Sequence, residues 1–492
     1  MRRALSILIC LALTLCALSA AAEDFDPYLE QKTLDYEEWI RTWQSTGLGG
    51  VSDLVFTDAT RTELLRTRGA GDSEDWTAFY LTSQAINYMV TGDETARSEV
   101  LRMADYLHLV HAVTQDPGYL ARYVGIDAPP WNVEYPLGHE NRYEGEGEYA
   151  DYFWLGHNVR DKYISWFWSL TWAYDAVEDE QMRATIRDDF RDVLLTLQAN
   201  DWTIIDPWGD VNVAAQILPT TRLAIILQTA HITDDQYFWS LLDYEYERNQ
   251  DLIWIATFSF FNKYFDYYGF INSHPVWNAL FRLWPDRERC EFLWEVYTVN
   301  VRPLVENTHN TFFDAVHYGA CLRIGGCDPA ELDYLKEDGL HTVTVMNEAP
   351  NYCRAVTCPE LPLDPFSVWA DEFLAGIPWL NELVDFDPQT AEAHQIEDRC
   401  WTSCLWEVSP YHIECTRGDD PTLVGHGQDY MVAYWLGVYY GVLPGPGPFP
   451  DAPFIDDPAD DDDDDDDDTS DDDDDDDDAA SDDDDDDDGC CE

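Results

Sequence analysis

The sequence predicts an all-α protein built as an (α/α)6 toroid, a closed ring of six helical hairpins. Three observations support this prediction. Apolar residues recur at helical spacing over most of the chain. Short turn signals such as "TGDE" separate consecutive helical segments. Within a pair, one segment is apolar around most of its circumference and the other has a wide polar face, which is typical of an inner and an outer helix.

The first hairpin is predicted from 76–90 and 95–113, with a turn and helix cap at 91–93. The second joins 160–177, "RDKYISWFWSLTWAYDAV", to the amphipathic segment 178–200. Strand-like alternation is scarce. The same pattern predicts four further hairpins: 212–231 with 234–258, 275–284 with 287–303, 309–324 with 329–338, and 366–383 with 423–441.

The two ends of the chain differ from this helical part. Residues 1–22 hold two arginines, an apolar stretch and small residues before a cleavage site, which is typical of a secretory signal peptide. We therefore expect a secreted or cell-surface protein without a transmembrane segment. The toroid domain is predicted to span 23–445. Residues 446–492 form a Pro/Gly linker and a poly-Asp tail, which is expected to be disordered because it has little apolar surface to bury.

The net charge of −70 at pH 7 is extreme. Three aspartate runs in the tail contribute much of it, but the chain stays strongly acidic without them, and it has only four lysines. High salt screens the repulsion within such a chain, so the composition indicates a salt-adapted, halophilic origin. The same charge argues against nucleic acid as a partner.

The cysteines of an exported chain favour disulfides over metal binding. No CxxC pair is present, whereas short segments such as "CLRIGGC" and "CRAVTC" allow local bridges. The spacing does not select a pairing. The eight candidates are Cys290, Cys321, Cys327, Cys353, Cys358, Cys400, Cys404 and Cys415.

Three segments carry a family resemblance: "TGDETARSEVLRMADYL", "VRDKYISWFWSLTWAYDAV" and "DYMVAYWLGVYYGVL". They resemble the hairpin signatures of the six-hairpin glycosidase superfamily, especially its secreted bacterial members, over most of 60–443. The resemblance implies an (α/α)6 toroid and a glycan ligand, with glycoside hydrolases and polysaccharide lyases both represented. The tail is loosely similar to the sorting tags of exported bacterial proteins, which suggests surface attachment through Cys490 and Cys491.

The stretch "YEGEGEYADY" places three glutamates within five residues, directly before an inner-type helix. Such carboxylates repel one another, so either solvent and salt screen them, a cation binds, or one carboxyl keeps its proton. Glu148 and Asp151 are therefore candidate acid and base of a glycosidase, with Asp210 or Asp429 across the funnel. Glu144 and Glu146 are candidate Ca²⁺ ligands, although no cofactor is required. A solvated acidic loop is the third alternative.

The helix start that follows offers a second kind of chemistry. His157 and Asp161 lie four residues apart on one helical face, and Tyr163 follows. These three side chains are candidate catalytic groups of a lyase, while Asn158 and Arg160 would bind the sugar acid. Asn158 could instead cap the helix.

Aromatic rings suit glycans because sugar C–H faces stack on them, so substrate-binding residues are expected among the aromatics of this region and the histidines of other loops. No Walker, Rossmann, HExxH or GxSxG motif is present. We therefore expect a glycoside hydrolase acting on a polysaccharide or oligosaccharide, with a lyase or a non-catalytic glycan-binding protein as alternatives. The expected substrate-binding residues are Trp131, Tyr152, Trp154, Asn158, Arg160, His274 and His317.

Overall fold

The computed structural model confirms that the protein is predominantly helical. The predicted signal peptide 1–22, the aspartate runs, Cys490 and Cys491 lie outside the described residues. The structure describes residues 24–454 except 46–47, 213, 257–262, 265–266, 355, 357–358, 378–385, 387, 400–408, 412–419 and 452.

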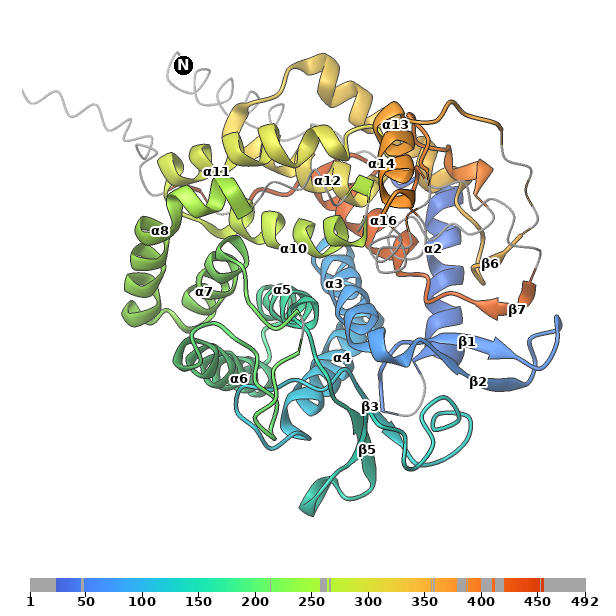
Figure 1. Cartoon of the computed structure of the whole chain (residues 1–492), viewed down its shortest axis with the longest axis vertical. Coiled ribbons are helices and arrows are strands. Elements are labelled where there is room, and N and C mark those ends of the chain that lie inside the picture. The colour runs from blue at the N-terminus through green and yellow to red at the C-terminus, as the bar shows by residue number, and fades with distance from the viewer. Residues whose placement is uncertain are drawn as a thin grey trace, which may run out of the picture. The chain divides into compact units, whose positions relative to one another are not determined.

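Six mostly buried helices pack against one another; we call them the inner helices and the set of six the ring (Figure 1). Each packs against the next in chain order, and the last packs against the first. Their residues are almost all buried, as expected for helices that are apolar around most of their circumference. They are α3 (Ser73–Thr91), α5 (Arg160–Ala176), α7 (Pro219–Thr233), α10 (Tyr268–Leu283), α12 (Thr311–Ala320) and α16 (Gln428–Tyr440).

Outer helices cover this ring. Five of them follow their inner helix after a short turn, and aspartate caps begin several of them: Asp93 accepts a hydrogen bond from the Thr95 amide at 3.0 Å, and Asp179 from the Met182 amide at 3.0 Å. These five are α4 (Glu94–Ala112), α6 (Glu180–Ala199), α8 (Gln236–Ala256), α11 (Arg287–Asn300) and α13 (Pro329–Val345).

The sixth pair differs from the prediction. The outer partner of α16 is the N-terminal helix α2 (Pro27–Trp39), which the sequence analysis did not identify. The ring of Tyr36 stacks on that of Tyr430 at 4.7 Å between centroids, and Lys32 donates to three backbone carbonyls at the end of α13. The expected pairing of 366–383 with 423–441 is therefore wrong. Helix α14 (Pro365–Ala375) packs instead against Tyr264 in a small separate cluster.

The few strands among the described residues are short, as expected, and lie in the connections that lead into the inner helices. One antiparallel sheet has the order β2-β1-β7-β6, and Leu54 pairs with Val424 in it. A second has the order β3-β5-β4 and precedes α5. The strands are β1 (Asp53–Phe56), β2 (Leu64–Arg68), β3 (Tyr123–Ile126), β4 (Arg142–Glu144), β5 (Tyr152–Leu155), β6 (Tyr352–Cys353) and β7 (Asp420–Val424).

Short helical turns complete the structure, and the packed chain continues past the expected boundary at 445. Phe449 stacks on Tyr439 at 5.4 Å, and Phe454 is buried beneath the guanidinium groups of Arg287 and Arg323. The first part of the expected linker is thus docked on the helical domain. The short turns are η1 (Ile40–Gln44), η2 (Ala70–Asp72), η3 (Gly147–Tyr149), η4 (Arg302–Leu304), η5 (Cys321–Gly325) and η6 (Ile396–Asp398).

Candidate functional site

Polar and charged side chains gather where the inner helices α3, α5 and α10 begin. Four of the six residues concerned are almost fully shielded from solvent, although they lie at the end of the ring rather than along its outer face. Two inner-helix starts contribute acids and a lysine, and a third contributes a tyrosine. We name this set the carboxylate–lysine cluster: Asp72, Glu74, Asp75, Lys162, Ser165 and Tyr268.

Lys162 is the centre of the cluster. Its ammonium group donates to Asp72 Oδ1 at 3.0 Å and to Asp75 Oδ2. Asp75 Oδ1 accepts a 2.5 Å hydrogen bond from the Ser165 hydroxyl, and the Tyr268 hydroxyl donates to Oδ2 at 3.3 Å. Both aspartates therefore bind one cation, which ties the start of α3 to that of α5.

The carboxyl groups of Glu74 and Asp72 have opposite electrostatic environments. Complete burial raises the pKa of Glu74 well above its ordinary value, and the neighbouring Asp75 adds to this. Burial alone would raise the pKa of Asp72 too, but Lys162 and Arg122 lower it overall. Two carboxyls with pKa values driven apart by their surroundings are typical of an acid and base pair.

The two carboxyls also differ in access. The Asp72 side chain is 41% exposed and pairs with Arg122 at 2.9 Å. Glu74 is fully buried, and its Oε1 atom has no hydrogen-bond partner within the described residues. A buried polar atom without a partner is rare in proteins, so Glu74 Oε1 lacks a contact that a water or a ligand group would supply on reaching this enclosed position.

Burial alone would lower the pKa of Lys162, but the charges of Asp72 and Asp75 raise it well above its ordinary value. The lysine is therefore held as a cation and is unsuited to act as a base. Its charge offsets that of Asp75, which is costly to bury without a partner, and that of the half-exposed Asp72.

A stack of three aromatic rings lies beside the start of α5. Tyr143 from β4 stacks on Trp208 at 4.1 Å between centroids, and Trp154 from β5 lies 4.8 Å from Tyr143 and 5.7 Å from Trp208. Trp208 is 52% exposed, which is high for so large an apolar ring. We call these three residues the aromatic stack. It offers a flat apolar face to solvent at the same end of α5 as Lys162.

Polar groups surround the aromatic stack. Asp206 Oδ1 accepts from the amides of Trp208 at 3.0 Å and Asp210 at 2.7 Å, which shapes the loop before α7. The exposed His157 lies 3.5 Å from the Tyr143 hydroxyl, and its backbone has φ 55°. The structure thus brings together three predicted residues, Trp154, His157 and Asp210.

Other predicted residues of this region have structural contacts. The Asn158 amide donates to the Leu120 carbonyl at 2.6 Å, and the Tyr163 hydroxyl donates to the Gly118 carbonyl at 2.9 Å. Both side chains are buried and bind the backbone of the segment before β3. Arg160 and Asp161 face each other, with Nε and Oδ1 3.9 Å apart. Tyr152 is partly buried in β5, and Trp131 is partly buried in the loop between β3 and β4.

The glutamates of "YEGEGEYADY" lie on the surface. Glu148 and Asp151 are exposed, in the turn that links β4 to β5. Glu144 pairs with the buried guanidinium of Arg142 at 2.8 Å, so its carboxylate already has a cation. Neither Glu144 nor Glu146 belongs to a group with the spacing of metal ligands among the described residues.

Three predicted residues on other inner helices are buried. Asp429 lies 3.8 Å from His426 at the start of α16, and the His426 ring stacks on Trp76 of α3. His274 stacks on Phe313 at 3.8 Å, and burial lowers its pKa to about 3.

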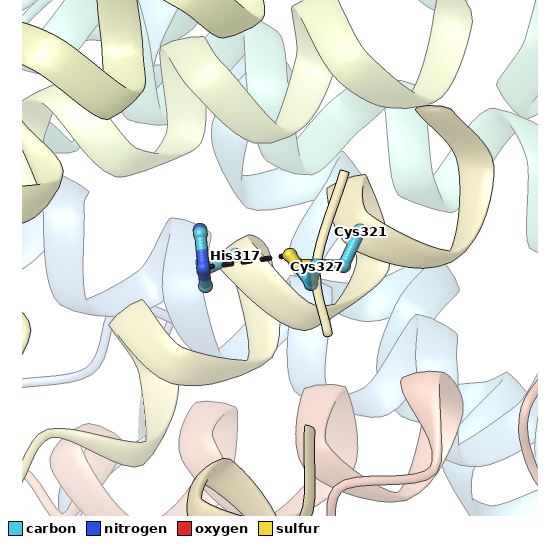
Figure 2. A group of neighbouring side chains, drawn as sticks. All are labelled: His317, Cys321 and Cys327. Atoms are coloured by element: carbon cyan, nitrogen blue, oxygen red, sulfur yellow. Dashed lines mark hydrogen bonds between the residues drawn. A yellow bond between two sulfur atoms is a disulfide. The ribbon is translucent and has the colours of Figure 1, made fainter. Parts of the chain in front are cut away.

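His317 is enclosed as well, and burial lowers its pKa to about 2. Figure 2 shows His317 beside the Cys321–Cys327 disulfide, with its Nε2 atom 3.9 Å from Cys327 Sγ. A second contact joins Nε2 to the Glu331 carboxylate at 2.8 Å.

The disulfide prediction is confirmed for one pair and wrong for Cys290. Cys321 and Cys327 are bonded, with Cα atoms 5.4 Å apart. Cys290 is free and buried on α11, where its thiol faces backbone carbonyls of α10. Cys358, Cys400, Cys404, Cys415 and the side chain of Cys353 lie outside the described residues.

Neither the carboxylate–lysine cluster nor Trp208 is among the site residues predicted from the sequence. The signal was present in "GDSEDW", where three acids precede a strongly apolar helix, and in Lys162, one of only four lysines. Trp208 lies between the two acids of "DPWGD".

No described helix combines the length and apolar character needed to cross a membrane. Comparisons with protein-family models, with curated proteins and with solved structures give no match to this chain.

Proposed function

We propose that this protein is a secreted (α/α)6 toroid that binds a neutral glycan at the end of the ring where the inner helices begin, and hydrolyses it there. The toroid assignment is supported by the contacts of the six inner helices, in which the last meets the first. Secretion is supported by the character of residues 1–22 in the sequence.

One observation carries the hydrolase proposal: two carboxyls of the same cluster, Asp72 and Glu74, have pKa values shifted in opposite directions. Glycoside hydrolysis needs a protonated carboxyl for the leaving oxygen and an ionised one to activate water or attack carbon. In this proposal Glu74 is the acid and Asp72 the carboxylate. Asp75, held by Lys162, Ser165 and Tyr268, positions both.

The aromatic stack is the proposed binding surface. A half-exposed indole offers a flat apolar face that matches the C–H face of a sugar ring. Asp206, Asp210 and His157 at its edge supply hydrogen-bond acceptors and donors for sugar hydroxyls. The glycan is proposed to be neutral because the strongly negative chain repels acidic sugars wherever salt does not screen the field.

The test is digestion of a glycan panel in high salt, with reducing ends and unsaturated products measured separately. We expect reducing ends from the native protein, their loss in Glu74→Gln and Asp72→Asn, and melting temperatures that show the variants are folded. Unsaturated products would show a lyase instead and refute the hydrolase proposal.

Binding is tested with Trp208→Ala, with Trp369→Ala as its matched control. Trp369 is 55% exposed on α14, away from the aromatic stack, so the two changes remove similar exposed rings. We expect Trp208→Ala to weaken glycan binding by about tenfold, or about 1.4 kcal/mol, and Trp369→Ala to leave it unchanged. Equal effects would refute the assignment of the binding surface.

The burial of Glu74 and Asp75 favours a second candidate function, non-catalytic glycan binding. Their side chains are closed off by neighbouring described residues, so a substrate reaches them only if a group at the end of the ring moves. Binding that depends on Trp208, without any product from the panel, would establish this candidate.

A further inference from the structure

Two histidines and an aspartate meet on the outer helices α4 and α6, labelled in Figure 1, apart from the carboxylate–lysine cluster. His108 Nδ1 lies 2.8 Å from Asp189 Oδ2, and His111 Nδ1 lies 3.0 Å from Asp189 Oδ1. His108 and His111 are three residues apart and therefore share one face of α4. His111 and Asp189 are buried, while the side chain of His108 is 44% exposed.

Both ring nitrogens of His111 face oxygen atoms that accept hydrogen bonds, one on Asp189 and one on Pro117. His111 Nε2 lies 3.2 Å from the carbonyl oxygen of Pro117, which can only accept a hydrogen bond. A neutral imidazole that donates there leaves a lone pair on Nδ1, facing a carboxylate oxygen at 3.0 Å. Two electron-rich atoms at this distance need a cation between them or a second proton on the ring.

The arrangement matches the chemistry of a transition-metal site. Two imidazoles and one carboxylate are the protein ligands of many zinc sites that keep a fourth position open. A backbone carbonyl on the far nitrogen of a ligating histidine, as Pro117 provides for His111, is the usual support that fixes ring orientation. The three ligand atoms lie within 4.8 Å of one another.

The two histidine–aspartate contacts are close to the spacing of a tetrahedral site. Tetrahedral bonds of about 2.0–2.1 Å place ligand atoms about 3.3 Å apart. His108 and His111 each meet a different oxygen of Asp189, at 2.8 and 3.0 Å, so each contact needs to widen by a few tenths of an ångström, and rotation of the half-exposed His108 ring provides this for the first.

We propose that His108, His111 and Asp189 bind a divalent transition-metal ion of the Zn²⁺ type, with the fourth position open on the exposed side of His108. One other group of His, Cys, Asp or Glu side chains among the described residues has suitable spacing for a metal ion. It consists of His317, Cys321 and Cys327, and it does not fit a metal ion. Its two sulfurs are joined in a disulfide and are not available as thiolates.

The test is a titration of the full, untagged chain with Co²⁺ at about pH 8, in excess Ca²⁺ to occupy the carboxylate-rich tail. We expect one Co²⁺ per chain with visible absorption of an imidazole-coordinated ion, which Zn²⁺ displaces. Zn²⁺ alone should also raise the melting temperature. His108→Ala is the main variant because its half-exposed side chain can be removed with little effect on folding, and Asp189→Asn is the second.

His231→Ala is the matched control. His231 pairs with Asp175 at 2.7 Å, but Arg282 also pairs with that aspartate at 2.8 Å, so a cation is already present there. We expect at least a tenfold loss of affinity in His108→Ala and Asp189→Asn and none in His231→Ala. Equal binding by all variants would overturn the proposal. Failure of the native chain to bind Co²⁺ at this pH would overturn it too, and would assign the second proton to the histidines.

Discussion

Replacing Lys162 by methionine tests whether the carboxylate–lysine cluster holds the start of α3 to that of α5. Methionine keeps the length and most of the apolar contacts of the lysine side chain but removes its charge. Asp75 would then stay buried, 1% exposed, and among the described residues it would keep the Ser165 and Tyr268 hydroxyls as its side-chain donors. Asp72 would keep Arg122.

The magnitude follows from the burial of the pair. Removing one partner of a buried ion pair costs about 3–5 kcal/mol because the other charge is left uncompensated. The entropy of unfolding is about 2.1 cal/mol/K per residue, or about 0.8 kcal/mol/K for roughly 400 ordered residues. The melting temperature should therefore fall by about 4 to 6 °C.

The assay is thermal unfolding followed by circular dichroism at about 0.2 M and about 2 M NaCl, since salt screens surface charges far more than buried ones. We expect the same fall at both salt concentrations. Lys336→Met is the control because Lys336 is exposed on α13, and its change should lie within about 0.5 kcal/mol. An equal melting temperature for Lys162→Met and the native protein would refute the buried-pair reasoning. A decrease in melting temperature that disappears at high salt would refute it too.

Three further predictions concern other parts of the molecule. His274 stays neutral in the folded state down to about pH 3, while the unfolded chain takes up its proton from pH 6.5, so acid destabilises the native protein. Between pH 6.5 and about pH 5 in urea unfolding, the native protein should lose about 1.6 kcal/mol of stability relative to His274→Leu, and a constant difference between the two proteins would contradict this. Replacing Cys321 and Cys327 together by serine opens a loop of sequence separation 6 and should cost about 2 kcal/mol, measured in the same way, and an unchanged free energy of unfolding would contradict this. Arg142→Met removes ion pairs to two half-exposed acids and should cost about 1.5–3 kcal/mol locally, seen as faster hydrogen exchange in 142–155 with unchanged exchange in α3.

Helical periodicity predicted most of the ring because inner and outer helices differ in the width of their apolar face. The hairpin 160–177 with 178–200 is close to α5 and α6 for this reason. The prediction was wrong where partners are distant in sequence. Helix α2 pairs with α16, and nothing local in "PYLEQKTLDYEEW" indicates which helix it will meet. Its mean hydropathy is low, so periodicity gave no signal.

The candidate site was harder to predict for a related reason. Glu148 was predicted as a catalytic residue because several acidic residues lie close to it in sequence. Clusters of acidic residues are as common in solvated loops as in active sites. Burial decides which carboxyl has a shifted pKa, and Glu74 obtains its burial from α5 and neighbouring loops rather than from its own segment. By contrast, Trp154, His157 and Asp210 were predicted from their place in loops before inner helices, and the structure brings these three residues together.

The contact between the first and last inner helices governs when the molecule can finish folding. Trp76 of α3 meets its partner ring, His426, only after the C-terminal part of the chain has been made. At 5–20 residues per second, the ribosome needs about 20 to 70 s to pass from Thr91 to Gln428. During this interval the growing half-ring exposes an apolar edge at each end, and a chain truncated before α16 would keep both edges permanently open.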